Sequence, residues 1–102
     1  MAQFDLFENP RSKTYPFLLD VQADLLRDLA SRVVVPLAPI GKLRGKPLAR
    51  LNPLVSIAGR DHAVLFQELA AIPTKALRAP IGNLRNRRDE LVAALDLLFA
   101  GV

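Results

Sequence analysis

The chain has 102 residues, of which 51% are hydrophobic, so it can bury one modest core and is not expected to be disordered. It has no cysteine, which excludes disulfides and cysteine-bound metals, and its formal charge of +4 favours anionic partners such as nucleic acid or an acidic protein segment, although a solvated surface explains that charge equally well. We find no secretory signal and no apolar run near the ~18 residues of a membrane span, so we predict one domain over residues 1–102, in the cytoplasm and without a membrane partner.

The first twenty residues predict a long β-hairpin. Residues 4–7 roughly alternate between apolar and polar, and residues 8–12 contain the asparagine, proline and serine of a turn. Residues 15–21 then resume a strand-like apolar pattern. Pro16 has no N–H to donate to a ladder, so we place it on an edge or at the start of its strand.

The middle of the chain contains short apolar runs separated by turn-forming residues. Residues 24–29 fit either a helical turn or a loop that returns the chain. Residues 40–47 contain two glycines and three basic side chains, which is typical of a mobile basic loop. We predict further strands at residues 32–37, 53–57 and 62–66, a turn at 59–61, a packed or turning segment at 70–73 and a candidate last strand at 75–77.

The last segment predicts an amphipathic helix that starts near Asn83, a plausible N-cap residue, although the cap could equally lie one or two residues later. Its apolar residues recur at helical spacing, at Leu84, Leu91, Val92, Leu95, Leu98 and Phe99. Arginines at 85, 87 and 88 oppose the helix dipole, so we expect them to serve a partner or a neighbouring acid, or to be tolerated on the surface. Strands followed by one helix predict an α+β fold, a small antiparallel barrel or sheet with the helix packed on it.

The sequence contains little that could carry catalysis. Its one histidine, His62, lies in a predicted strand, where a structural or solvent-facing role is the usual one. We find no metal-ligand spacing, no phosphate-binding glycine loop and no serine beside a base, so we predict no metal site and no cofactor. The apolar residues 98–102 are the sharpest feature, because an exposed apolar end marks an interaction surface, unless it packs onto its own domain or a dimer mate.

Several segments resemble, in order and along nearly the whole chain, the CcdB family of toxins. Residues 17–26, FLLDVQADLL, resemble the family signature around the motif DVQ-x-D, and residues 32–37, RVVVPL, resemble a second signature. Residues 53–57 and 71–73 fall where the family has matching segments. Residues 94–102, ALDLLFAGV, resemble the C-terminal segment of the family, which ends in a glycine followed by an aliphatic residue.

The resemblance implies an SH3-like small β-barrel with a C-terminal helix, the fold shared with the MazF and Kid ribonuclease toxins. It further implies a homodimeric toxin that is not an enzyme, that binds the A subunit of DNA gyrase and that traps the gyrase on cleaved DNA. A CcdA-like antitoxin would neutralise it through a flexible acidic segment. The pair represses its own operon, so contact with DNA is expected only through the antitoxin complex.

In the family the gyrase-binding surface lies at the dimer two-fold axis and is built from the ends of both C-terminal helices. The residues of this chain that match that surface by position are Leu25, Leu26, Asp96, Phe99, Ala100, Gly101 and Val102. Ala100 is a departure, because it stands where the family has a tryptophan. Aromatic side chains dominate binding hot spots, so the resemblance implies a surface that keeps its shape but lacks its largest side chain.

The basic loops fit an acidic antitoxin segment, which positive charge would steer towards them. The antitoxin-binding residues that we predict are Arg11, Lys13, Lys42, Arg44 and Lys46. Two alternatives stay open: a ribonuclease toxin on the same fold, and an attenuated relative that binds antitoxin without poisoning gyrase.

Overall fold

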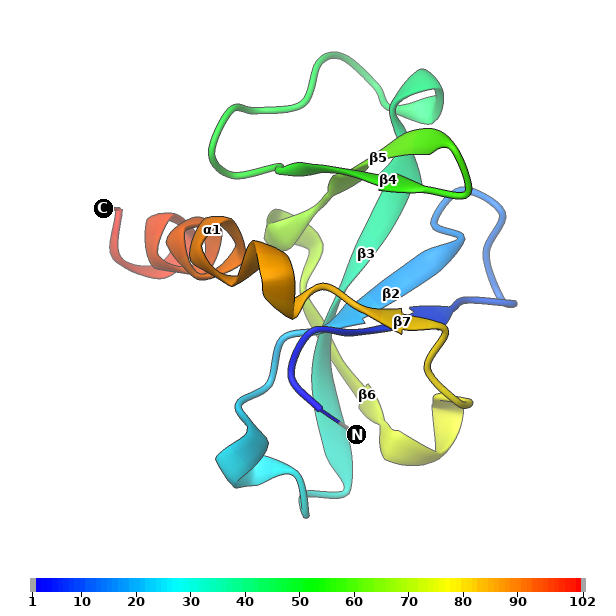
Figure 1. Ribbon diagram of the computed structural model, residues 1–102, viewed down its shortest axis with the longest axis vertical. Helices are drawn as coiled ribbons and strands as arrows, with labels where there is room; N and C mark the ends of the chain where they lie inside the picture. The colour runs from blue at the N-terminus through cyan, green and yellow to red at the C-terminus, as the bar shows by residue number, and fades with distance from the viewer. Residues whose placement is uncertain (1, 102) are drawn as a thin grey trace.

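The computed structural model describes residues 2–101. Short strands and single turns of 3-10 helix (η) precede an α-helix (Figure 1). In chain order they are β1 (Asp5–Glu8), β2 (Phe17–Asp20), η1 (Asp24–Leu26), β3 (Ser31–Pro39), η2 (Ile40–Lys42), β4 (Leu54–Ile57), β5 (Arg60–Val64), η3 (Phe66–Glu68), β6 (Ala70–Pro73), η4 (Thr74–Ala76), β7 (Gly82–Asn83), η5 (Arg85–Arg87) and α1 (Arg88–Ala100). No helix within residues 2–101 is long and apolar enough to cross a membrane.

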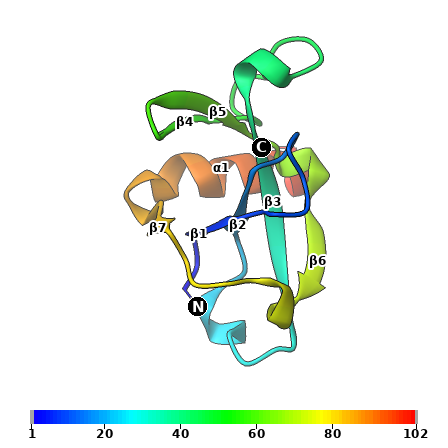
Figure 2. The same ribbon diagram turned by 90° about the vertical axis from the view of Figure 1, so that its right-hand side faces the viewer.

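The strands of residues 2–101 form one antiparallel sheet in the order β4-β5-β3-β2-β1-β7, with β6 also paired to β3. β3 is long enough to pair with three strands. β6 pairs with its first residues, β5 with its last residues and β2 with its middle. Pro36 lies between the parts of β3 that pair with β6 and β5, where no ladder N–H is needed, and its carbonyl oxygen accepts a hydrogen bond from Leu65 N at 2.9 Å. The sheet curls around β3 into a small barrel (Figures 1 and 2), which confirms the predicted α+β fold.

The core is divided between the two faces of the sheet, because successive strand side chains point to opposite faces. On one face α1 contributes Leu91 and Ala94, both fully buried, to the larger hydrophobic cluster, which also contains Leu19 and Val35. On the other face a smaller cluster gathers Phe7, Val34 and Leu77. The packing of α1 on the sheet thereby determines which residues of its last turn remain outside the core.

Several of the predicted elements are confirmed in place. The predicted hairpin is β1 paired with β2, in a register that sets Leu6 opposite Leu19, and Pro16 lies immediately before β2. The helical turn predicted within residues 24–29 is η1. The strands predicted at 32–37, 53–57 and 62–66 correspond to parts of β3, β4 and β5, although β5 ends at Val64 and Phe66 begins η3.

The last strand predicted at residues 75–77 is wrong. Residues 74–76 form η4, in which Leu77 N donates a hydrogen bond to the carbonyl oxygen of Thr74 at 3.1 Å. The pairing strand is instead β6 at Ala70–Pro73, the segment predicted only to pack or turn. The apolar Leu77 is buried because it completes the smaller cluster, not because it belongs to a ladder.

The turn predicted at residues 59–61 lies one residue earlier. Ala58 and Gly59 have φ values of +54° and +77°, and Ile57 is paired with Arg60 across this two-residue connection. Two positive φ values in succession are typical of the tight hairpin turns that match strand twist. Arg60 and Asp61 therefore belong to β5.

The last α-helix begins later than Asn83. The side chain of Asn83 accepts a hydrogen bond from Arg85 N at 2.7 Å in the turn that leads into η5, and α1 begins only at Arg88. Arg87 donates from Nε to Glu90 at 2.7 Å and from Nη2 to the carbonyl oxygen of Leu54 at 2.9 Å. The neighbouring acid expected for this arginine group is thus found for Arg87, whose hydrogen bond lowers the pKa of Glu90.

A buried ion pair holds β2 to β3. Asp20 and Arg32 are fully buried, and Arg32 donates from Nε to Asp20 Oδ2 at 2.9 Å and also from Nη2. Burial raises the pKa of the Asp20 carboxyl, against the opposing hydrogen bonds from Gln22 N and Arg32. Arg32 Nη1 has no hydrogen-bond partner within residues 2–101, so this charge depends on Asp20 alone.

Candidate functional site

Two exposed apolar segments lie on the same side of the molecule. In η1 the side chain of Leu25 is 91% exposed, and at the end of α1 that of Phe99 is 71% exposed. Figure 1 shows η1 and the projecting end of α1 on the left, opposite η2 and the β1–β2 connection. The predicted site residues on η1 and at the end of α1 are here called the tip surface: Leu25, Leu26, Asp96, Phe99, Ala100 and Gly101.

The position of Phe99 near the end of α1 leaves it exposed. Leu91, Leu95 and Leu98 recur at spacings of three and four and pack on the larger core cluster. Phe99 follows Leu95 by four residues, yet it is 71% exposed, because this end of α1 projects beyond the sheet (Figure 1). The two apolar residues at the end of α1 therefore differ in burial: Leu98 packs onto its own domain, whereas Phe99 does not.

Gly101 ends α1 and turns the chain. It has a φ of +75° and donates its N–H to the carbonyl oxygen of Leu97 at 3.1 Å, which is the geometry of a left-handed helix C-cap. Glycine adopts this conformation without the cost that a Cβ would impose. The predicted site residue Val102 lies outside the described residues.

Buried polar side chains hold the η1 leucines in place. Gln22 is 7% exposed and accepts a hydrogen bond from Val33 N at 3.0 Å while its amide donates to the carbonyl oxygen of Leu26 at 2.9 Å. Asp20 in turn accepts from Gln22 N at 2.9 Å. The buried ion pair of Asp20 is thus linked to η1, where Leu26 is 46% exposed.

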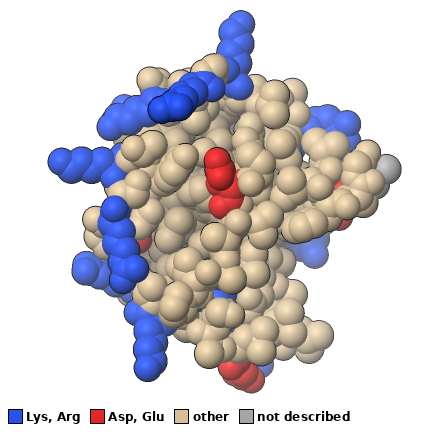
Figure 3. All heavy atoms as spheres, turned by 180° about the vertical axis from the view of Figure 1, so that it is seen from behind, with Lys and Arg blue, Asp and Glu red and all other residues tan. Residues whose placement is uncertain are grey.

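The predicted antitoxin-binding residues lie mostly away from the tip surface. Figure 3 shows Lys and Arg side chains along the left margin, which is the side of η2 and the β1–β2 connection in Figure 1. Lys13 and Lys42 line one pocket, and Lys42 lines another together with Arg44. Lys46 is exposed further along the chain and lines neither of these pockets.

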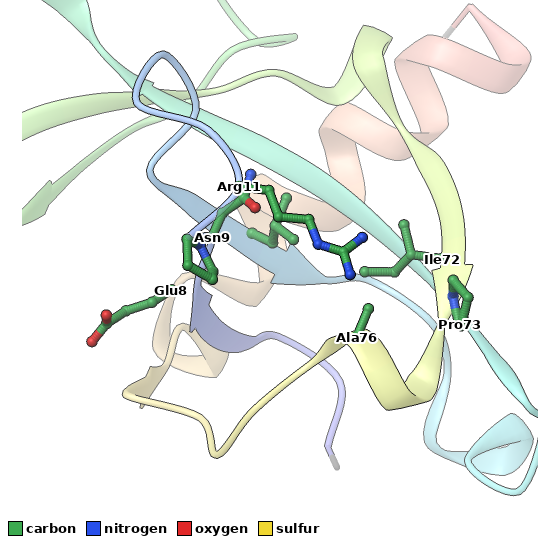
Figure 4. Close-up of a pocket in the computed structure, with 8 residues that line it drawn as sticks. Glu8, Asn9, Arg11, Ile72, Pro73 and Ala76 are labelled. Atoms are coloured by element: carbon green, nitrogen blue, oxygen red, sulfur yellow. The ribbon is translucent and has the colours of Figure 1, made fainter.

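Arg11 lies at a separate pocket of about 200 Å³ between the β1–β2 connection and the β6–η4 segment. Its side chain extends towards Ile72 of β6, whereas Glu8 points away from the pocket (Figure 4). The structure therefore distributes the predicted basic set over several local sites.

Two residues that the sequence reading left without a binding role, Arg60 and His62, line the pocket of Lys13 and Lys42. Their spacing of two residues places both side chains on one face of a strand, and this spacing is the sequence signal that could have grouped them. Leu29, 52% exposed beyond η1, extends the apolar surface and was also missed.

The curled barrel and its C-terminal helix define a small α+β barrel protein with exposed apolar side chains at the helix end. The model of a known family, described as CcdB protein, matches residues 3–101, nearly the whole chain. The protein therefore belongs to the CcdB family, whose members are toxins of toxin–antitoxin modules rather than catalytic enzymes.

Proposed function

We propose that this protein binds the A subunit of DNA gyrase through the tip surface and traps the gyrase–DNA complex in its cleaved state. It acts in the cytoplasm as a homodimer, in which the α1 ends of two protomers meet at the two-fold axis. A CcdA-like antitoxin neutralises it, and the toxin reaches DNA only as part of the complex with that antitoxin.

The observation that carries this proposal is the exposure of Phe99 beside the bend at Gly101. An aromatic side chain that is 71% exposed adds nothing comparable to the core, so its free energy of burial is available to a partner. The η1 leucines lie on the same side and provide further apolar area. The basic residues lie mostly elsewhere, so gyrase and antitoxin can approach different faces.

The test is a gyrase cleavage assay with supercoiled DNA and ATP. We compare the intact protein with a variant that lacks residues 101 and 102, and we expect linear DNA from the intact protein only. Circular dichroism and sedimentation verify that the shortened variant keeps its fold and its dimer. Cleavage by both proteins refutes a role for the tip, and cleavage by neither refutes gyrase poisoning and favours an attenuated relative.

Ala100→Trp is expected to lower the concentration needed for half-maximal cleavage about tenfold or more, which corresponds to about 1.4 kcal/mol of added binding. Ala100 is exposed at the end of α1, so a large side chain meets no core residue. Ala93→Trp, at another exposed position of the same helix, is the matched control and is expected to leave cleavage unchanged. Equal gains from both variants would mean that added hydrophobicity, rather than the tip surface, is responsible.

A further inference from the structure

The single turn η1, which carries Leu25 and Leu26 of the tip surface, is held by little side-chain packing. None of its three residues is buried, and Leu25 is 91% exposed. A short turn of 3-10 helix has few hydrogen bonds of its own, and their geometry is poorer than in an α-helix. The position of η1 is therefore set by contacts from other segments of the chain.

Gln22 supports η1 from the side of the sheet. Its side-chain oxygen accepts a hydrogen bond from Val33 N in β3 at 3.0 Å, and its side-chain amide donates to the carbonyl oxygen of Leu26 at 2.9 Å. Because Gln22 is buried, water competes little for either bond. The last residue of η1 is thereby fixed relative to β3.

The start of the chain supports η1 from a second direction. We define the N-terminal turn as residues 2–5, and Figures 1 and 2 show it beside η1. Gln3 N donates to Asp24 Oδ1 at 2.7 Å, and the side-chain amide of Gln3 donates to the carbonyl oxygen of Val21 at 3.2 Å. Both bonds join residues far apart in the sequence, so the first residue of η1 is fixed by tertiary structure.

The N-terminal turn is itself rigidly built. Asp5 N donates to the carbonyl oxygen of Ala2 at 3.0 Å, and Phe4, at the third position of this turn, has a φ of +69°. Glycine is the usual residue there, yet Phe4 is fully buried in the larger core cluster. Asn83 adds a bond from Nδ2 to the carbonyl oxygen of Gln3 at 3.1 Å. Backbone strain of this kind persists where the surroundings over-determine the conformation, and it is found at functional sites.

We propose that Gln3, Gln22 and Asp24 are positioning residues of the tip surface, which hold η1 in its binding conformation before gyrase arrives. They act through Leu25 and Leu26, which make the contact. A preformed turn loses less conformational freedom on binding, and the affinity rises accordingly. The inference rests on the proposed binding of gyrase and deepens it, because it assigns the support on which one half of the tip surface depends.

Amide hydrogen exchange of the full-length protein tests whether these residues hold η1. Leu26 N and Arg27 N donate to the carbonyl oxygens of Ala23 and Asp24 at 2.9 and 3.1 Å, so their exchange reports on the turn. In Asp24→Ala and in Gln22→Met we expect both amides to exchange at least about threefold faster, because the turn opens locally.

The same variants are then compared in the gyrase cleavage assay. Asp24→Ala and Gln22→Met are each expected to raise the concentration needed for half-maximal cleavage roughly three- to tenfold, as loss of one hydrogen bond does. Asp24→Asn removes the charge but keeps a side-chain oxygen that accepts from Gln3 N. It is expected to stay within about twofold of the unmodified protein in exchange and in cleavage.

Two matched variants control for charge and for stability. Asp61→Ala removes the same charge from an exposed residue of β5. Asn52→Leu removes a buried side-chain amide that, like that of Gln22, joins two backbone groups: it accepts from Leu48 N at 2.9 Å and donates to the carbonyl oxygen of Val64 at 3.1 Å. Both variants are expected to leave η1 exchange and cleavage within about twofold, although Asn52→Leu lowers the midpoint of urea unfolding.

Three outcomes would overturn the inference. They are unchanged η1 exchange in Asp24→Ala and Gln22→Met, faster exchange without loss of cleavage, and a loss of cleavage in Asp24→Asn or Asn52→Leu as large as in the test variants. Absence of cleavage by the unmodified protein refutes the proposed function instead, since the exchange rates alone then sustain or overturn the support of η1.

Discussion

Phe99→Ala is expected to raise the concentration needed for half-maximal gyrase-dependent DNA cleavage roughly 30- to 1,000-fold. This range corresponds to about 2–4 kcal/mol, the free energy lost when a central aromatic residue of an interface is truncated. The large effect is expected because Phe99 is the largest side chain of the tip surface, whereas position 100 carries only alanine. The measurement is the amount of linear DNA formed as a function of protein concentration.

The exposure of Phe99 separates binding from stability in this experiment. Since Phe99 lies outside the core, its truncation is expected to shift the midpoint of urea unfolding only slightly. Leu48→Ala, which truncates another apolar side chain that is 58% exposed, is the matched control and is expected to cleave as the unmodified protein does. Sedimentation shows whether the dimer persists. Unchanged cleavage by a dimeric Phe99→Ala protein would remove the α1 end from the gyrase-binding surface.

Removal of the Asp20 carboxylate is expected to give the largest loss of stability, about 3–5 kcal/mol for Asp20→Leu. That is a large part of the total for a small domain. Within residues 2–101 Asp20 is the one hydrogen-bond partner of the buried Arg32 guanidinium, so the substitution leaves an uncompensated buried positive charge. It also removes the acceptor of Gln22 N. Urea unfolding at neutral pH measures the loss.

The same pair predicts an ordering of variants and a dependence on pH. Arg32→Met is expected to cost less than Asp20→Leu, because a buried carboxyl can take up a proton, and the double variant is expected to be more stable than Asp20→Leu alone. Burial already raises the pKa of Asp20, and loss of Arg32 raises it further. The folded protein then binds a proton more readily than the unfolded chain, so the cost of Arg32→Met shrinks as the pH falls from about 7 to about 5. A constant cost, or a double variant less stable than either single one, would contradict a charge-based role.

Local sequence patterns predicted much of the fold. The alternation and turn residues around β1 and β2 predict their hairpin, and the three- and four-residue spacing from Leu91 to Leu98 predicts the buried stripe of α1. These patterns predicted the boundaries of the helices and strands less well. Asn83 is a good cap by type, yet it does not cap α1, because its backbone pairs with β1 and η5 separates it from the start of α1 at Arg88.

The sequence predicted the candidate site only in part. The resemblance assigns the tip residues by position, but residue type does not predict exposure. Leu98 and Phe99 are adjacent and apolar, yet Leu98 packs on the larger core cluster whereas Phe99 is 71% exposed. The sequence did not predict the pocket that Lys13, Lys42 and Arg60 line together. These residues come from three segments whose proximity depends on pairing between distant strands.

The sequence by itself determined the α+β class, the basic character and the family, because composition, hydrophobic period and ordered motifs are properties of the chain read locally. Only the tertiary structure decided which charges are buried as a pair and which line a pocket. Asp20 and Arg32 look like ordinary surface residues in the sequence, yet the pairing of β2 with β3 encloses both. Burial and proximity arise from contacts between residues far apart in the chain, and local pattern carries no information about them.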